Sequence, residues 1–192
     1  ACHIAGLPFP DQLLDRLQRR NLLQPTDSGW RFAHNMLRDV LTDRARETGN
    51  WVGFNRICAQ MLRHLSEDEP PSERLARYLI RGDQHAAALD PLMDAIDYHG
   101  RRGDVARAEQ LFRQAQKSFA ESDLNDASPS HARMKLLEGR LTLSRQVQLE
   151  LAEDQLEECR QICDEHGHRT IAIDALLGLS RVHLWRGDES RA

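Results

Sequence analysis

The sequence lacks the features that mark many enzymes and membrane proteins. No apolar run approaches the ~20 residues that a helix needs to cross a bilayer, and no signal-peptide pattern is present. A phosphate-binding Gly-x-x-x-x-Gly-Lys-Ser/Thr loop is absent, as is a Gly-x-Ser-x-Gly nucleophile motif. We therefore expect no catalysis, no cofactor held by this chain alone and no membrane contact, and we expect the cytoplasm as its compartment.

A net excess of positive charge is absent, and cysteine is sparse. The 192 residues carry a net charge of −4, and residues 1–65 hold nine arginines against six acidic residues, so the remainder is acidic. Because nucleic-acid binding needs clustered basic residues, we expect no nucleic-acid partner. The four cysteines lack the dense spacing of a disulfide scaffold. The composition, with 40% apolar and 29% charged residues, suits a soluble helical protein.

Amphipathic helices dominate what is present. Apolar residues recur at three- and four-residue steps from Trp51 to Leu65, which predicts a helix with Phe54 and Met61 buried. The polar, proline-terminated stretch 66–71 is the clearest break in the chain. A further helix is expected to start at Ser72 or Glu73.

A turn sequence then repeats. Arg-Gly-Asp occurs at 81–83, 102–104 and 186–188. In each case we expect the glycine to end one helix in the left-handed conformation and the aspartate to cap the next. Small alanines after the first two turns would let paired helices approach closely. This pattern resembles tetratricopeptide repeats, with units nearer 40 residues than the usual 34.

These turns divide the second half into helical hairpins. We expect one over residues 84–120, one joining 131–147 to 149–166, and a third that begins at 169–185. Pro91 either kinks its helix or restarts it behind an Asp90 cap.

The apolar positions predict which side chains these hairpins bury. Leu111 and Phe112 are expected in the core of the first hairpin, and Leu137 and Leu141 are expected to face the helix that contains Leu156. An incomplete last repeat is expected to leave an uncovered apolar end with Leu184 and Trp185. The Asp90, Asp94 and Asp97 series is either a solvated face or a binding stripe.

The most distinctive stretch lies near the start, at residues 30–41. An aromatic strand (Trp30 to Phe32) ends at His34, and a helix with Leu37 follows at once. Together with the preceding helix and a turn through Pro25, residues 21–34 read as the wing hairpin of a winged-helix domain. The arrangement resembles the winged-helix segment of STAND-type NTPases, in which a Met-His-Asp-like tripeptide occupies the place of residues 33–35 here.

The resemblance implies that His34 contacts the diphosphate of ADP in a larger parent protein, with ATP and ADP as the cofactors of that parent. A histidine beside free backbone N–H groups at a helix start suits a phosphate oxygen. The alternative is a histidine that packs at the strand end and bonds to the backbone. Since the phosphate-binding loop is missing, we expect the chain to be a fragment that binds nucleotide negligibly by itself.

One cluster invites a metal interpretation. Cys159, Cys163, His166 and His168 lie at the end of a predicted helix, and cysteine with histidine can hold zinc in a tetrahedral site. The two cysteines also continue an apolar stripe that must face a partner helix, and histidine is favoured at a helix C-terminus in any case. We therefore predict no metal, with this cluster as the weak candidate.

A concave face of the repeats is the predicted binding surface. By spacing, His131, Lys135 and Glu138 are expected to share one exposed face, with Arg181 and His183 as weaker candidates. Ordinary solvated positions are the alternative for each of them. The predicted partner is a protein or peptide.

The fold expected is therefore all-α with one small β-hairpin. Residues 1–48 form a partial winged helix, 49–82 a bridging helical region and 83–192 tetratricopeptide-like hairpins of an α-solenoid, incomplete at the C-terminus. The resemblance implies a regulatory sensor that couples partner binding to a nucleotide-controlled switch and to oligomerisation of the parent. The alternative is an adaptor that binds a peptide or helix with no link to nucleotide.

Overall fold

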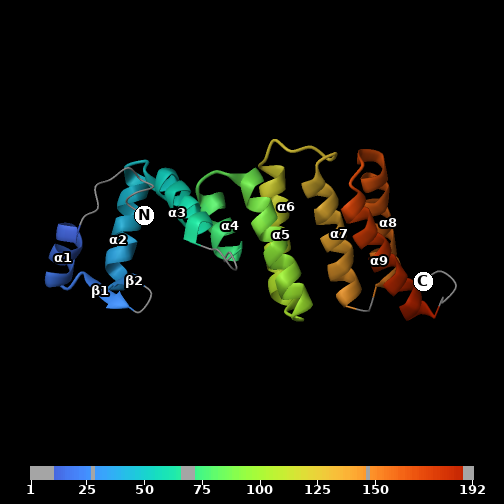
Figure 1. Cartoon of the computed structure of the whole chain (residues 1–192), viewed down its shortest axis with the longest axis horizontal. Coiled ribbons are helices and arrows are strands. Elements are labelled where there is room, and N and C mark those ends of the chain that lie inside the picture. The colour runs from blue at the N-terminus through green and yellow to red at the C-terminus, as the bar shows by residue number, and fades with distance from the viewer. Residues whose placement is uncertain (1–10, 27–28, 66–71, 146–147, 188–192) are drawn as a thin grey trace. The chain divides into compact units, whose positions relative to one another are not determined.

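The computed structural model describes residues 11–26, 29–65, 72–145 and 148–187 (Figure 1). It is mostly helical, with one small antiparallel sheet, as expected. The chain forms two compact units, residues 1–71 with 81–83 and residues 72–80 with 84–192. This division splits the predicted bridging region 49–82 between both units. Within the described ranges, none of the helices combines the length and apolar character that a membrane crossing requires.

The first unit contains a hairpin between helices. Helix α1 (Asp11–Arg19) is followed by β1 (Leu23–Thr26) and β2 (Gly29–Phe32), which pair antiparallel in the register Leu23 with Phe32 and Thr26 with Gly29. Helices α2 (Asn35–Glu47) and α3 (Trp51–Leu65) complete it. The two predicted strands and the helix that follows them are thus present, whereas the predicted turn includes residues 27–28, which lie outside the described residues.

Helix α3 presents a different face inward from the one predicted. Phe54 is 53% exposed and Met61 is half-buried, whereas Asn55 and Ala59 are buried. The prediction assigned the largest apolar residues to the buried face. In the structure the buried face contains smaller residues one position away, such as Asn55 next to Phe54. Trp51 lies under two guanidinium groups, with Arg46 4.9 Å and Arg81 5.8 Å from its ring centroid, which favours cation–π attraction.

The second unit consists of α4 (Ser72–Arg81, of which residues 72–80 belong here), α5 (His85–Arg101), α6 (Val105–Ala120), α7 (Pro129–Ser144), α8 (Leu149–His166) and α9 (Arg169–Arg186). Consecutive helices pack as pairs, α5 with α6 and α7 with α8, and α8 also packs on α9. In addition α5 contacts α7, and α7 contacts α9 (Figure 1). Helices α5, α7 and α9 therefore form one row of neighbours.

The turns confirm the predicted capping at one Arg-Gly-Asp and correct it at another. Gly103 has φ of 77°, and the Asp104 side chain accepts a hydrogen bond from the Arg107 backbone N–H at 3.2 Å. In the 81–83 turn the left-handed residue is Asp83, with φ of 56°, rather than Gly82. Gly82 is buried, and its carbonyl accepts a 2.7 Å hydrogen bond from Arg56. The third turn extends beyond the described residues at 188.

Pro91 lies inside α5, which runs from His85 to Arg101 without interruption. The restart behind an Asp90 cap is therefore wrong. Proline in a helix removes one backbone hydrogen bond, and α5 tolerates this in its second turn.

Helix α7 is the centre of the second unit because two cores meet on it. One core gathers side chains of α4 to α7, among them Leu111 and Phe112, both buried as predicted. The other joins α7 to α8 and α9. Leu137 and Leu141 belong to the first core and not, as predicted, to the face toward α8. A helix that is apolar on both sides gives no single stripe, so spacing alone did not identify the correct face.

Leu156 connects three helices in the second core. It is fully buried on α8, between Gly139 of α7 and Gly178 of α9. A Cβ atom at Gly139 would lie 2.7 Å from the Leu156 Cγ, and one at Gly178 would lie 2.9 Å from a Leu156 methyl. The two glycines are thus required by the close approach of the helices rather than by a turn.

Candidate functional site: a groove between α5, α7 and α9

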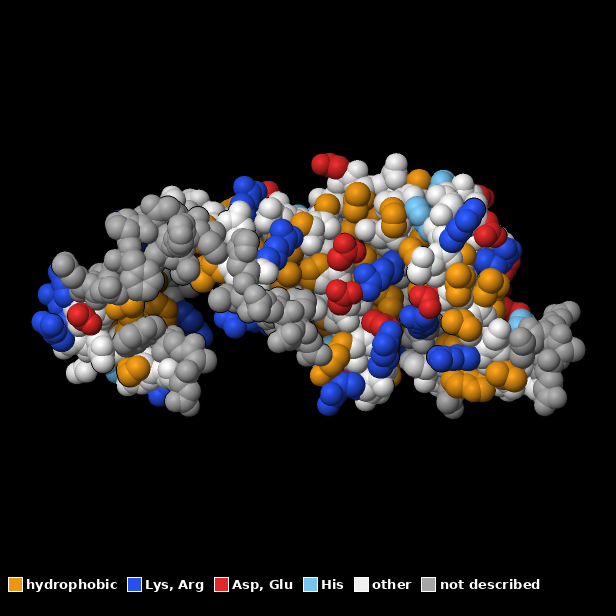
Figure 2. Space-filling model, in the orientation of Figure 1, with side chains coloured by type: hydrophobic (Ala, Val, Ile, Leu, Met, Phe, Trp, Pro, Cys, Tyr) orange, Lys and Arg blue, Asp and Glu red, His pale blue; other side chains and the backbone are white. Residues whose placement is uncertain are grey.

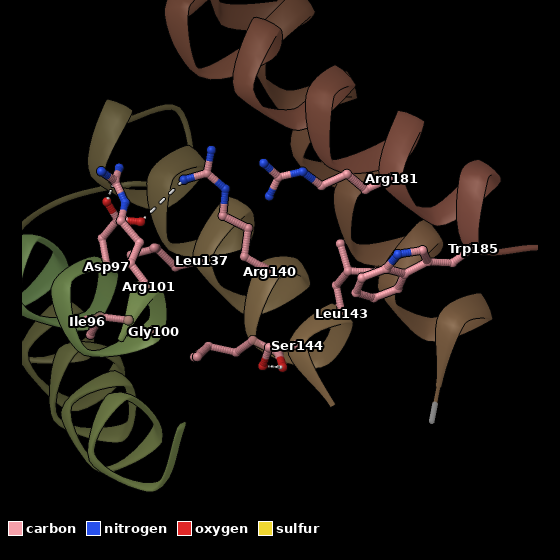
Figure 3. A pocket seen from close by; sticks show the side chains of 11 residues that line it. Ile96, Asp97, Gly100, Arg101, Leu137, Arg140, Leu143, Ser144, Arg181 and Trp185 are labelled. Carbon is pink, nitrogen blue, oxygen red and sulfur yellow. Dashed lines mark hydrogen bonds and ion pairs between the residues drawn. The ribbon is translucent and has the colours of Figure 1, made fainter. Parts of the chain in front are cut away.

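A groove of about 700 Å³ opens between the three helices of this row, entirely within the second unit. Its floor comes from α7 and its walls from α5 and α9 (Figure 3). The lining side chains and backbone belong to Ile96, Asp97, Gly100, Arg101, Leu137, Arg140, Leu141, Leu143, Ser144, Arg181 and Trp185. We refer to it as the α5–α7–α9 groove.

Ion pairs join the three helices beside the groove. Arg140 of α7 reaches Asp97 of α5 at 3.5 Å and Asp174 of α9 at 3.1 Å. Asp97 also pairs with Arg101 one turn along α5 at 2.5 Å. Arg140 therefore links α7 to both α5 and α9. The positive charges of Arg140 and Arg101 are largely compensated by carboxylates.

Arg181 is different from the other two arginines. It is exposed, and none of the ion pairs or hydrogen bonds of the described side chains includes it. Trp185 follows one turn later on the same wall. Figure 3 shows the Arg181 side chain extending from α9 across the groove on the side of Arg140, and the indole of Trp185 beside Leu143. The groove thus combines an apolar surface with an uncompensated cation.

The aspartates of α5 are used to attach α7. Arg133 of α7 lies 2.6 Å from Asp94 and 3.7 Å from Asp90, while Asp97 pairs with Arg140. Asp90 and Asp94 are still more than half exposed, so the solvated interpretation fits these two residues, whereas Asp97 is mostly covered by its contact with α7. Figure 2 shows blue and red side chains side by side on the second unit, with orange side chains around them.

The predicted partner-binding residues of α7 lie outside the groove. The ring of His131 stacks on Phe119, and its Nδ1 is 2.9 Å from the Asp126 carbonyl oxygen. Lys135 pairs with Glu158 of α8 at 3.0 Å and with Glu138 at 3.7 Å. Burial opposes its charge, yet these two carboxylates raise the pKa of Lys135.

The expectation of an exposed face was therefore wrong for these three residues. Their side chains are only 16–30% exposed, because interhelix contacts cover them. Of the two weaker candidates, Arg181 lines the groove. His183 is mostly buried on the opposite side of α9, 4.0 Å from Glu153 of α8. Partner binding by the four residues outside the groove stays a prediction.

The cysteine and histidine cluster does not converge. Cys159 and Cys163 are fully buried in the second core, facing the partner helix as expected. Burial raises the pKa of the Cys159 thiol to about 12, and its Sγ donates to the Ala132 carbonyl at 3.3 Å. His168 instead lies 2.9 Å from the Ala127 carbonyl. No group of three or more candidate metal ligands gathers among the described residues.

His34 precedes the first turn of α2. Its backbone is extended, with φ of −129° and ψ of 131°, and its carbonyl accepts from the Leu37 N–H at 3.1 Å. Its ring is exposed and does not cap the helix. The packed and bonded alternative is therefore not seen in the part of the chain that the structure describes. Contact with a nucleotide stays a prediction.

Sequence reasoning named Arg181 as a candidate, Asp97 as part of a possible binding stripe and Trp185 as part of an exposed apolar end. It missed Arg101 and Arg140 and did not place these residues in one groove. A signal was available, because Asp97, Arg140 and Arg181 follow one another at spacings close to the predicted repeat length of about 40 residues. Arg101, Ser144 and Trp185 follow one turn after each. Aligning the hairpins with one another would have identified these positions as one surface.

Comparisons of this chain with protein-family models, with curated proteins and with solved structures found no match. The groove and its chemistry are therefore the basis for the functional argument.

Proposed function

We propose that the second unit binds a segment of another protein in the α5–α7–α9 groove, as tetratricopeptide-like solenoids do on their inner helices. One observation carries this proposal. Helices α5, α7 and α9 line one groove that combines apolar side chains with an arginine that has no ion pair among the described residues. Small-molecule sites enclose most of their ligand, whereas this groove is partly open to solvent and better suits a peptide or a helix.

We further propose that the chain is the sensor part of a STAND-type signalling ATPase. Support comes from the order of helix, hairpin and helix in the first unit and from the exposed ring of His34 ahead of α2. In this proposal the first unit contacts ADP in the resting parent protein. Partner capture by the second unit then promotes nucleotide exchange and assembly of the parent.

The adaptor function is the alternative, and one observation favours it. The groove and both cores that support it lie in the second unit, so binding there requires nothing from the first. An adaptor would bind its partner equally well whatever nucleotide is present.

The adjoining coding sequence separates the two proposals. A Gly-x-x-x-x-Gly-Lys-Ser/Thr loop upstream in the same reading frame is expected for the ATPase, and its absence from the full gene contradicts that proposal. In the full-length protein, His34→Ala should release ADP faster and raise basal signalling. Met36→Ala is the matched control, because Met36 is exposed two positions away. Unchanged ADP retention in His34→Ala would leave His34 with a structural role only.

A further inference from the structure

We propose that the occupant of the α5–α7–α9 groove is an acidic protein segment with a large apolar side chain next to its carboxylate. The proposal rests on the binding function given above and adds the chemistry of the partner. Arg181 binds the carboxylate, and the apolar side chain lies on Trp185 and Leu143.

The charge balance of the groove carries the first step. Three guanidinium groups line it, those of Arg101, Arg140 and Arg181, against the single carboxylate of Asp97. Asp97 lies 2.5 Å from Arg101 and 3.5 Å from Arg140, and Arg140 has a second partner in Asp174. Arg181 alone has no carboxylate among the described residues, so the groove has an excess positive charge at that point.

The apolar residues next to Arg181 indicate the second property of the partner, a large apolar side chain. Trp185 is about half exposed at the groove wall and lies beside Leu143 (Figure 3), while Leu141 and Ile96 are nearly buried residues that line the groove. Tryptophan and arginine are both enriched among the residues that dominate binding energy at protein interfaces. A wholly apolar segment would leave Arg181 covered and unpaired, and a basic segment would repel it.

The geometry on α9 carries the third step. Arg181 and Trp185 are separated by one helical turn and face the same side. A bound segment can therefore contact both with side chains that are near neighbours in its own sequence. The groove thus recognises a carboxylate of the partner together with an adjacent apolar residue, rather than charge alone.

A selection from a random displayed peptide library tests the proposal on the full chain. The blocked control is Gly100→Trp, because Gly100 lines the groove and a Cβ there meets no atom within 4 Å. Peptides retained by the wild type and lost on Gly100→Trp are groove ligands. We expect them to be enriched in Asp or Glu beside Leu, Ile, Phe or Trp. Selection on Arg181→Glu should shift the enrichment to Lys or Arg.

Affinity measurements on the selected peptides sharpen the test. Fluorescence anisotropy should show Arg181→Glu and Arg181→Ala weakening acidic peptides about tenfold or more, as for a hydrogen bond to a charged group. Arg113→Glu is the matched control and should leave affinity unchanged, because Arg113 is exposed on α6 outside the groove. Ionic strength of about 1 M should weaken the same peptides, since the screening length falls to about 3 Å.

The outcomes separate this inference from the function on which it rests. Groove-dependent peptides without acidic enrichment, or with affinities that Arg181→Glu does not change, overturn the inference and leave peptide binding intact. If the selection yields no peptide whose retention depends on an open groove, peptide binding itself is overturned. Sedimentation could also show that the wild type is a dimer and that Gly100→Trp is a monomer. That result would assign the groove to a second copy of this chain and overturn the proposed occupant.

Discussion

Apolar side chains are buried to different extents in the two compact units. In the second unit Leu79, Leu89 and Leu156 are fully buried, whereas in the first unit Met36, Val40 and Phe54 are each more than half exposed. The helices of the second unit pack in pairs and in a row, so each apolar stripe meets another. In the first unit the described residues leave the apolar stripe of α2 uncovered. Both units are mainly helical in their described residues, so the difference between them lies in how the helices pack.

The largest effect should come from the first core of the second unit. Truncating Phe112 to Ala should lower the free energy of unfolding by about 3–5 kcal/mol, because burial is lost and a cavity opens. Urea unfolding followed by far-UV circular dichroism measures it. Since repeat arrays need not unfold in one step, the transition of the second unit should be fitted separately. A loss below about 1 kcal/mol would contradict the burial of Phe112.

A close helix approach should produce the next largest effect. Gly139→Ala places a Cβ atom 2.7 Å from the buried Leu156 Cγ and should destabilise the second unit by about 1–3 kcal/mol. Gly100→Ala is the matched control. No atom lies near that Cβ, so the better helix propensity of alanine should stabilise by about 0.5–1 kcal/mol. Thermal unfolding of both variants should therefore shift in opposite directions, and equal shifts would contradict the packing described.

An acidic group within the second unit should make its stability depend on pH. The hydrogen bond from Arg107 holds the pKa of Glu73 below its ordinary value of 4.5, against the opposing effect of burial. Folding thus favours the ionised carboxylate. Its contribution is complete above the unfolded pKa and is lost as pH falls through the folded pKa. Arg107→Gln should flatten the decrease of the urea midpoint below about pH 5, whereas Arg113→Gln should not.

The smallest effect should be found in the first unit. Phe54→Ala should change the free energy of unfolding by less than about 0.5 kcal/mol, because its side chain is mostly exposed. Amide hydrogen exchange provides the accompanying comparison, with α2 expected to exchange faster than α7. A loss of several kcal/mol in Phe54→Ala would show that Phe54 has a partner and would weaken the contrast between the units.

Much of the fold was predictable because the relevant signals are local. Apolar spacing located α3, α6, α8 and α9 to within a few residues, and the glycine and aspartate at 103 and 104 located a turn. The inward face of α3 and the two faces of α7 were not predictable, since both depend on which helices become neighbours. Phe54 and Leu137 were assigned from size and spacing, and tertiary packing decided otherwise.

The candidate site was less predictable than the fold. Lys135 and Glu138 have the spacing of an exposed pair, but Lys135 also pairs with Glu158 of another helix and is thereby part of an interhelix contact. Trp185 was expected at an uncovered apolar end, and its exposure confirms that much. Trp185 shares a groove with residues of α5 and α7 only because α5, α7 and α9 pack side by side, and this packing is not visible in the sequence. Contacts between residues distant in sequence are the information that a single sequence does not display.

The position of Leu156 between two glycines has a consequence for how this sequence can change through descent. Alanine at Gly139 or Gly178 meets the leucine side chain, so either change is tolerated better after position 156 has become smaller. In the reverse order a lineage must pass through an overpacked intermediate. The three positions on three helices are therefore coupled, because changing a glycine first overpacks the contact and shrinking Leu156 first leaves a cavity.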